Sequence, residues 1–175
     1  MSSTDRRNFL KTAALGAAAT WIQPELGALY ALPSGANLRV GLVGCGRQGR
    51  AILAELAKIE GVQVTAICDT DERRLSSSGR RAPEAKPYAT HGALLEADEV
   101  DAVIVATPTH LHVGPATDAL SAGKHVYCEA PLAHTIEDAQ AISRAAKGAS
   151  GVFHAGFLGR SNPVYKLARS FVRSG

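Results

Sequence analysis

Two features of the 175-residue sequence predict an α/β fold built on a doubly wound parallel sheet. First, β-branched and leucine-rich runs alternate with helical patterns from residue 38 onward, as in sheets whose parallel strands are joined by helices. Second, a glycine-rich segment at residues 44–49 joins the first apolar run directly to the first helical pattern. The length corresponds to about one domain, and 46% hydrophobic with 20% charged residues suits a packed core.

Six short apolar runs predict the strands. The first, residues 38–43, reads Leu-Arg-Val-Gly-Leu-Val, and the clearest, residues 100–106, reads Val-Asp-Ala-Val-Ile-Val-Ala. Near-continuous runs of this kind are typical of strands that are buried on both faces. In chain order the expected strands are residues 38–43, 62–68, 86–89, 100–106, 125–128 and 152–156.

Helical periodicity and end signals place helices between these strands. Gly61, Gly123 and Gly148 end three of them, and Thr135 caps the start of the helix that Gly148 ends. In chain order the expected helices are residues 47–60, 71–77, 91–97, 111–122, 136–147 and 162–173. On the first helix, the side chains expected to face the sheet are those of Ala51, Leu53, Ala54, Leu56 and Ala57.

The segment at residues 44–49, here called the glycine turn, has the spacing Gly44-x-Gly46-x-x-Gly49. Gly44 permits the tight turn, Gly46 lets a pyrophosphate approach the backbone, and Gly49 lets the following helix pack closely. Free N–H groups and the positive dipole end of that helix also attract phosphate. Asp69 follows twenty positions after Gly49, where a carboxylate can accept hydrogen bonds from ribose hydroxyls. Together these features predict a Rossmann-type dinucleotide site, and a tight turn that binds nothing is the alternative.

Other strand ends carry further candidates. Ligands of doubly wound sheets lie outside the carboxyl ends of the strands. Thr107-Pro108 follows the strand at residues 100–106, and Glu129-Ala130-Pro131 follows the strand at residues 125–128. We expect both segments to meet the glycine turn and Asp69 at one crevice.

Charge and cysteine usage limit the choice of partners. The net charge of +3 is spread along the chain, which gives nucleic-acid binding little support. Cys45, Cys68 and Cys128 have no C-x-x-C spacing and fall near the ends of predicted strands. We therefore expect buried free thiols, typical of folding in a reducing compartment, and no metal site.

Residues 1–36 are interpreted as an export signal. Arg6-Arg7, followed by Phe-Leu-Lys, precedes a weakly apolar stretch at residues 12–22 that is too short and too mild for a membrane span. The paired arginines resemble a twin-arginine signal, although Asp5 stands where Ser or Thr is commoner. This resemblance implies the twin-arginine export machinery as a partner and a periplasmic or extracellular location. A basic amphipathic helix is the alternative.

Two further motifs carry a family resemblance. Residues 106–112 read Ala-Thr-Pro-Thr-His-Leu-His, and residues 122–133 read Ala-Gly-Lys-His-Val-Tyr-Cys-Glu-Ala-Pro-Leu-Ala. With the glycine turn, they closely resemble the Gfo/Idh/MocA oxidoreductases. The resemblance implies an NAD(P)-binding domain, a C-terminal α/β open-sheet domain that is missing from these residues, sugar or cyclitol substrates, and a homo-oligomer. The expected parts are a signal at residues 1–36, a dinucleotide-binding domain at 37–156 and the start of a truncated C-terminal domain at 157–175.

The resemblance also implies roles for single residues. Asp69 matches the acid that binds ribose, and Thr107-Pro108 matches the turn that borders the cofactor. Glu129 matches the glutamate that contacts the nicotinamide ribose, and His112 the histidine that follows the Thr-Pro turn. The alternative for Thr107-Pro108 is a strand-ending turn. For Glu129 it is a solvated charge, and for His112 a packing residue. The candidate cofactor-binding residues are Gly44, Gly46, Arg47, Gln48, Gly49, Asp69, Arg73, Thr107, Pro108, His110, His112 and Glu129.

The chain departs from the family at one important position. Ala130 stands where relatives have the lysine of a Glu-Lys-Pro motif, which assists proton transfer or orients the substrate hydroxyl. Alanine has no titratable group, so the catalytic residues remain unassigned. Glu129 and His154 are weak candidates, and for His154 a packing role is the stronger expectation. Three residues resemble the start of the substrate region: Arg160, Asn162 and Tyr165.

Asp69 favours NAD because its charge repels the 2′-phosphate of NADP, whereas Arg73 or Arg74 could pair with that phosphate. An exported enzyme is expected to hold its cofactor through turnover. The sequence therefore predicts the nucleotide-binding domain of an exported oxidoreductase that transfers hydride at a sugar or cyclitol hydroxyl. The alternatives are an NAD-dependent glycosidase that uses transient oxidation and elimination, and a non-catalytic dinucleotide-binding fragment.

Overall fold

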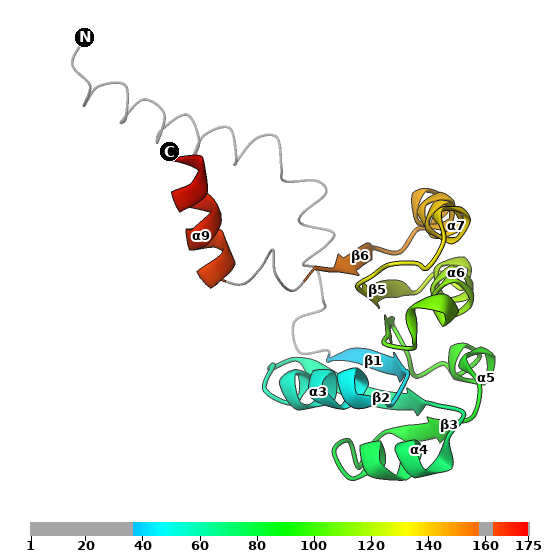
Figure 1. Cartoon of the computed structure of the whole chain (residues 1–175). Helices are drawn as coiled ribbons and strands as arrows, with labels where there is room; N and C mark the ends of the chain where they lie inside the picture. The colour runs from blue at the N-terminus through cyan, green and yellow to red at the C-terminus, as the bar shows by residue number, and fades with distance from the viewer. Residues whose placement is uncertain (1–36, 158–162, 175) are drawn as a thin grey trace, which may run out of the picture. The chain divides into compact units, whose positions relative to one another are not determined.

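The computed structural model describes residues 37–157 and 163–174. Its centre is a six-stranded sheet in the order β3-β2-β1-β4-β5-β6, with every neighbouring pair parallel (Figure 1). The expected doubly wound parallel sheet is therefore confirmed, and the strand order reverses between β1 and β4. The strands are β1 (Leu38–Val43), β2 (Val62–Cys68), β3 (Lys86–Tyr88), β4 (Ala102–Val105), β5 (His125–Glu129) and β6 (Phe153–Gly156).

Helices cover both faces of the sheet, α3 and α4 on one side and α5, α6 and α7 on the other (Figure 1). Leu53 of α3 forms a core with Leu42 and Ile67, whereas Leu120 of α6 and Ile142 of α7 belong to a second core. This burial from both sides explains why the strands read as continuous apolar runs. The helices are α3 (Arg47–Leu56), α4 (Glu72–Gly79), α5 (His91–Leu95), the 3₁₀ turn η1 (Thr109–Leu111), α6 (Val113–Ser121), α7 (Ile136–Gly148) and α9 (Pro163–Arg173).

Helix α3 differs from its prediction in length. It ends at Leu56 instead of Glu60. The residues that follow close into tighter turns, in which the Lys58 N–H donates to the Glu55 carbonyl and the Ile59 N–H to the Leu56 carbonyl, both at 3.0 Å. Bonds over three residues at a helix end are a usual way to satisfy its last carbonyls.

The face of α3 that contacts the sheet was also predicted wrongly in part. Gly49 and Leu53 are buried and Leu56 is half-buried, whereas the alanines are exposed. Gly49 fixes the rotation of the helix because it lies against the Gly44 carbonyl oxygen, and positions four and seven residues further on then face the sheet. The exposed alanines are Ala51, Ala54 and Ala57.

The remaining elements lie where the sequence predicts them, with ends that differ by a few residues. The strand expected at residues 100–106 is shorter, and the helix expected at residues 111–122 is divided into η1 and α6. The predicted cap of α7 is confirmed, since Thr135 Oγ1 accepts the Asp138 N–H at 3.1 Å. The boundaries of the expected domains stay predictions.

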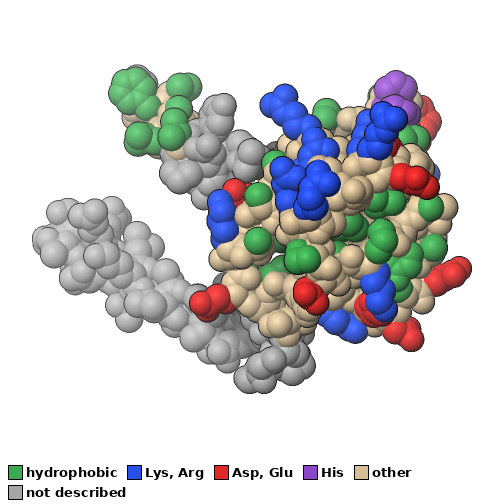
Figure 2. Space-filling model, turned by 90° about the horizontal axis from the view of Figure 1, so that it is seen from below, with side chains coloured by type: hydrophobic (Ala, Val, Ile, Leu, Met, Phe, Trp, Pro, Cys, Tyr) green, Lys and Arg blue, Asp and Glu red, His purple; other side chains and the backbone are tan. Residues whose placement is uncertain are grey.

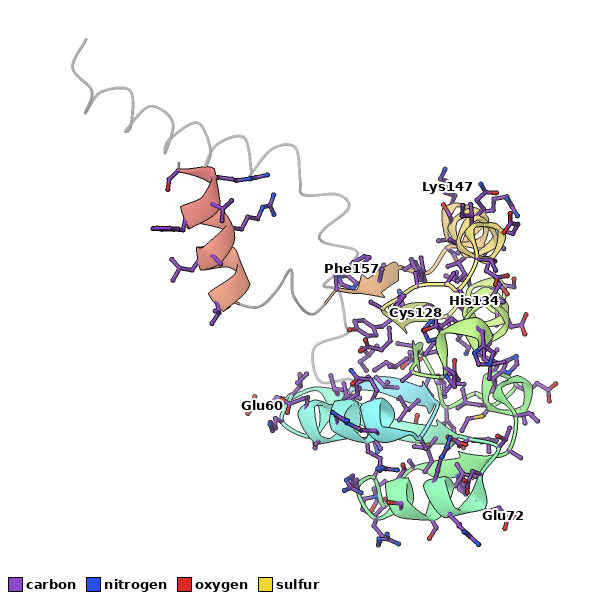
Figure 3. All side chains as sticks on the ribbon, in the orientation of Figure 1. Glu60, Glu72, Cys128, His134, Lys147 and Phe157 are labelled. Carbon is purple, nitrogen blue, oxygen red and sulfur yellow. The ribbon has the colours of Figure 1, made fainter. Side chains whose placement is uncertain are left out.

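The three cysteines are free and buried, which agrees with the sequence analysis; Cys128, labelled in Figure 3, lies on β5. On the face seen in Figure 2, acidic and basic side chains lie among one another. None of the helices that the structure describes is long and apolar enough to cross a membrane. The expected export signal lies outside the described residues.

Candidate functional site

A cavity of about 850 Å³ opens at the carboxyl ends of β1, β2 and β4, where the strand order reverses. Such a switch point is the general ligand site of doubly wound sheets. The glycine turn, Asp69 and Thr107-Pro108 all lie on its walls, as the strand-end argument predicts. Its lining comprises Val43, Gly44, Gly46, Arg47, Gln48, Arg50, Cys68, Asp69, Thr70, Arg74, Ala89, Thr90, His91, Ala106, Thr107, Pro108, His110, Leu111, Val113, Gly114 and Pro115.

The three glycines of the turn have separate steric roles. Gly44 has φ +102°, and a Cβ there would lie 2.6 Å from the carbonyl carbon and oxygen of Ala106. A Cβ on Gly49 would overlap the carbonyl oxygen of Gly44, so α3 can approach the turn only with glycine at this position. A Cβ on Gly46 would meet no atom within 4 Å. The space beside Gly46 is therefore open on the cavity side, where a ligand can reach the backbone.

The start of α3 is suited to bind an anion. Its N-cap is Gly46, which offers no side-chain hydrogen bond, and its first turn has no acidic residue. The first amide N–H groups of a helix have no partner within the helix, and the helix dipole makes this end positive. Arg47 and Gln48 extend this end along the cavity wall. Phosphate is the ligand that such an end most often binds.

Asp69 connects the glycine turn to the second strand end. Its Oδ2 accepts the Cys45 N–H at 2.8 Å, and its Oδ1 accepts the Asp71 N–H at 2.9 Å. The residue is only 9% exposed, yet it lines the cavity. Its carboxylate thus fixes the turn and remains able to accept further hydrogen bonds from a ligand.

Arg74, rather than Arg73, lies at the cavity wall. Its guanidinium nitrogens are 4.0 Å from Asp69 Oδ1 and 3.6 Å from Asp71 Oδ2. Arg73 contributes its backbone N–H, which donates to Asp71 Oδ1 at 2.8 Å, and the Asp71 side chain thereby caps α4. Of these two arginines, Arg74 therefore brings its charge to the cavity, beside two carboxylates; Arg47 and Arg50 also line the cavity.

Thr107 supplies an unsatisfied polar atom to the cavity wall. Its hydroxyl oxygen is buried and has no hydrogen-bond partner among the described residues. Buried hydroxyls are nearly always paired, so an orphan at a cavity wall fits a site that a polar ligand completes. The open backbone at Gly46, the uncapped helix start and this hydroxyl together fit a dinucleotide.

The two candidate histidines of the 107–112 segment have different positions. His110 lines the cavity, whereas His112 is 2% exposed and does not. His112 Nε2 lies 2.8 Å from the Thr107 carbonyl oxygen, and its Nδ1 lies 3.2 Å from the Leu132 carbonyl oxygen. This geometry favours the packing interpretation, in which His112 ties the β4 turn to the segment after β5.

Glu129 lies beside the cavity instead of on its wall. Gln48 Nε2 donates to Glu129 Oε1 at 3.2 Å, and the Tyr127 hydroxyl donates to the same oxygen at 3.3 Å. Ala130, which follows it, is exposed and outside the lining, as is Pro131. The fourth strand end is thus joined to the glycine turn by a hydrogen bond.

The weak catalytic candidates are only partly described. His154 is exposed and stacks on the Tyr127 ring, with centroids 5.7 Å apart and planes 6° apart, which fits the packing role expected for it. Arg160 and Asn162 lie outside the described residues, and so does the Tyr165 side chain.

Several lining residues were missed by the sequence analysis. Thr70 follows β2, and residues 89–91 follow the short strand β3. The strand-end rule that selected Asp69 would also have selected these positions. Arg50 and Gly114 lie in helices, and no sequence signal singles them out.

The three cysteine thiols are held in their neutral, unreactive form by burial. Burial raises the pKa of Cys68 and of Cys128 to about 12, and it also raises the pKa of Cys45. Neutral thiols are poor nucleophiles and poor metal ligands. Within residues 37–157 and 163–174, no group of three or more His, Cys, Asp or Glu side chains could hold a metal ion.

Comparisons with known proteins agree with this geometry. Residues 38–157 match the Gfo/Idh/MocA profile, described as an oxidoreductase family with an NAD-binding Rossmann fold. The chain is 36% identical to glycosyl hydrolase family 109 protein 2 of Shewanella sp. strain ANA-3, over 79% of this chain and 36% of that protein. It is 34% identical to inositol 2-dehydrogenase of Salmonella paratyphi B, over 79% of this chain and 42% of that protein.

A solved structure shares the fold. The WlbA dehydrogenase of Bordetella pertussis, in complex with NADH and UDP-GlcNAcA, superposes with a TM-score of 0.74 at 28% identity, over 81% of this chain and 41% of that one. The chain thus spans 36–42% of the length of these relatives. On its sequence match and its fold, the chain belongs to the Gfo/Idh/MocA oxidoreductases, the family with an NAD-binding Rossmann fold.

Proposed function

We propose that the described sheet is the nucleotide-binding domain of an oxidoreductase that transfers hydride at a sugar or cyclitol hydroxyl, and that NAD binds in the cavity. One observation carries the proposal: the uncapped start of α3 opens into the cavity at Gly46, next to the buried Asp69 carboxylate. The substrate class is supported by the inositol 2-dehydrogenase and WlbA relatives.

The chain's own residues bind and orient the ligand. The α3 amides and dipole hold the pyrophosphate, and Asp69 accepts hydrogen bonds from a ribose hydroxyl. Thr107 lines the cavity, and its buried hydroxyl, which has no hydrogen-bond partner among the described residues, is the candidate partner for a polar ligand atom. When bound, the nicotinamide supplies the hydride acceptor or donor, and fixed orientation is the main contribution of a positioning domain.

NAD is preferred over NADP in this proposal. The Asp69 carboxylate repels a 2′-phosphate, and Arg74 already lies near both Asp69 and Asp71. The positive charge that a 2′-phosphate needs is therefore partly neutralised by two carboxylates. NADP binding then requires Arg74 to leave these partners.

A second candidate function is an NAD-dependent glycosidase. Ala130 provides no proton-transferring group, and the chain is 36% identical to a glycosyl hydrolase family 109 protein. In such a cycle a sugar hydroxyl is oxidised, the adjacent glycosidic bond is eliminated, water adds, and the product is reduced again. No net oxidation occurs, so the same cofactor serves every turnover.

Export and tight retention of the cofactor belong to the same proposal. Arg6-Arg7 and the mild apolar stretch after them support a twin-arginine route to the periplasm or beyond. Free nicotinamide cofactor is not expected outside the cytoplasm, which favours a cycle that regenerates its own cofactor. We also propose that the full-length enzyme is a homo-oligomer, as the family resemblance implies.

The proposal is tested by calorimetric titration of the purified chain with NAD, NADP and ADP. Wild-type protein should bind NAD and ADP. Gly46→Ala adds a methyl group that meets no protein atom within 4 Å, so the fold should persist while the pyrophosphate is kept away. We expect NAD and ADP affinities to fall by about tenfold or more, the effect of losing roughly 1.4 kcal/mol of binding free energy.

Gly79→Ala is the matched control, because its Cβ also meets no atom within 4 Å and Gly79 does not line the cavity. Its affinities should equal those of the wild type. If Gly46→Ala bound both nucleotides as tightly as this control, the pyrophosphate would not lie at the start of α3.

A further inference from the structure

The topology assigns the two halves of a dinucleotide to different strands. The strand order reverses between β1 and β4, and a dinucleotide lies across such a switch point with its pyrophosphate at the intervening helix start. One nucleoside then lies over β2, near Asp69. The other lies over β4 and β5, on the side of Glu129. Glu129 is therefore placed to act on the second nucleoside only.

Glu129 is held by one side chain of α3 and by one side chain of its own strand, β5. Gln48 of α3 and the Tyr127 hydroxyl both donate to Oε1, at 3.2 Å and 3.3 Å. Oε2 accepts the Ala130 N–H at 3.3 Å. A carboxylate has about four lone-pair sites, so a further donor can still bind.

The Tyr127 ring is itself fixed by β6. His154 lies opposite Tyr127 in the β5–β6 register, and the two rings stack with nearly parallel planes. Gly156 leaves room for the phenol, because a Cβ there would lie 2.5 Å from the Tyr127 hydroxyl oxygen and 2.7 Å from Cζ. Burial and the nearby Glu129 raise the pKa of Tyr127, so the hydroxyl remains a donor at neutral pH.

We infer that Tyr127 is a positioning residue which, in the space left by Gly156 and together with Gln48, holds Glu129 as the acceptor for a ribose hydroxyl on the nicotinamide side of the dinucleotide. The inference rests on the proposed function and adds to it that different residues bind the two halves of the dinucleotide. Tyr127 acts through Glu129 on one half of the ligand and leaves the adenosine half unaffected.

The test compares NAD with ADP, because ADP lacks the nicotinamide half. In the full chain, Tyr127→Phe removes only the hydroxyl. We expect NAD affinity to fall by about three- to tenfold, the effect of one hydrogen bond, while ADP affinity stays unchanged. Gly156→Ala should act in the same direction, since its methyl group displaces the phenol. Tyr88→Phe, on β3, is the matched control and should change neither affinity.

A double-mutant cycle separates positioning from a merely structural role. Because Tyr127 acts through Glu129, Tyr127→Phe should cause no further loss of NAD affinity in a Glu129→Ala background. The inference is overturned if Tyr127→Phe weakens NAD and ADP equally, leaves NAD binding unchanged, or still weakens NAD in that background. A wild-type chain that binds neither NAD nor ADP overturns the proposed function, and this inference with it.

Discussion

Two carboxylates, Asp69 after β2 and Glu129 at the end of β5, are held in different ways. Both Asp69 oxygens accept backbone N–H groups, and the residue is almost buried. Glu129 Oε1 accepts two side-chain donors, Gln48 and Tyr127, its Oε2 accepts one backbone N–H, that of Ala130, and the residue is half-buried. Backbone donors are fixed once the turn forms, whereas side-chain donors must lose rotamer freedom first. The Asp69 half of the site is therefore fixed by backbone donors, and the Glu129 half depends more on side chains, one of which, Gln48, comes from the distant helix α3.

The largest predicted effect tests whether the two halves are equally packed. Cys68 lies on β2 and Cys128 on β5, and burial raises the pKa of both thiols from the ordinary 9.0 to about 12. Since the thiolate is the reactive form, alkylation at pH 8 should be about a thousandfold slower than for an ordinary thiol. The rate should rise by about tenfold per pH unit as the thiolate fraction grows.

Mass spectrometry of iodoacetamide-labelled peptides measures both rates, with urea-unfolded protein as the control. Equal protection of Cys68 and Cys128 is the expected outcome. Rapid labelling of Cys128 alone would mean that the β5–β6 half opens by itself, and the two halves would then differ in stability as well as in the type of donor.

The second effect concerns the backbone that holds Asp69. Gly49→Ala places a methyl group against the Gly44 carbonyl oxygen, so α3 must move away from the turn. We expect the free energy of unfolding to fall by about 1–3 kcal/mol, the usual cost of overpacking, together with a loss of NAD binding. Urea denaturation measures the change. Gly148→Ala, whose Cβ meets no atom within 4 Å, should stay within about 0.5 kcal/mol of the wild type.

The third prediction concerns the negative charge of Asp69. Asp69→Asn turns one acceptor oxygen into a donor that faces a backbone N–H, which leaves that N–H unpaired. NAD affinity should fall by about tenfold, the lower part of the range for a lost hydrogen bond to a charged group. Removal of the charge should also narrow the preference for NAD over NADP. Titration with both nucleotides measures this ratio, and an unchanged ratio would mean that Asp69 does not select the cofactor.

The smallest effect on stability is expected at Glu129. Glu129→Gln keeps one oxygen for the donors from Gln48 and Tyr127, which lie in a partly exposed position. The free energy of unfolding should change by less than about 0.5 kcal/mol, as for other surface substitutions. Thermal unfolding beside Asp69→Asn makes the comparison direct. A loss of stability as large as that of Asp69→Asn would show that side-chain donors fix the site as firmly as backbone donors do.

The parts of the site that could be predicted from the sequence are those that backbone geometry fixes. The glycine turn, Asp69 and the strand ends were found because local rules link these residue types to backbone geometry. Gly49 shows how direct this link is, since its missing Cβ is itself the requirement for helix packing. The doubly wound parallel sheet was predicted as well, because strands that alternate with helices restrict the fold to few topologies, whereas the order of the strands comes from the structure.

Side-chain contacts between distant segments were not predictable in this way. Gln48 and Glu129 are 81 positions apart, and nothing in their local sequence indicates a hydrogen bond. The choice of Arg74 over Arg73 at the cavity depends on the rotation of α4, just as the exposed alanines depend on the rotation of α3. A helical pattern gives a period, but tertiary contacts decide which positions of that period face inward.

Helix α3 has Gly46 as its N-cap and so lacks a side-chain cap, although a Ser or Asp there would stabilise it by roughly a few tenths of a kcal/mol. A phosphate bound at that position accepts hydrogen bonds from the same amide groups and so acts as a helix cap that is present only while the ligand is bound. Its binding shifts the folding equilibrium by mass action, which makes the first turn of α3 a reporter of cofactor loading. Amide hydrogen exchange in the first turn of α3 should slow when the nucleotide binds, because these N–H groups are then hydrogen-bonded to the phosphate of the ligand.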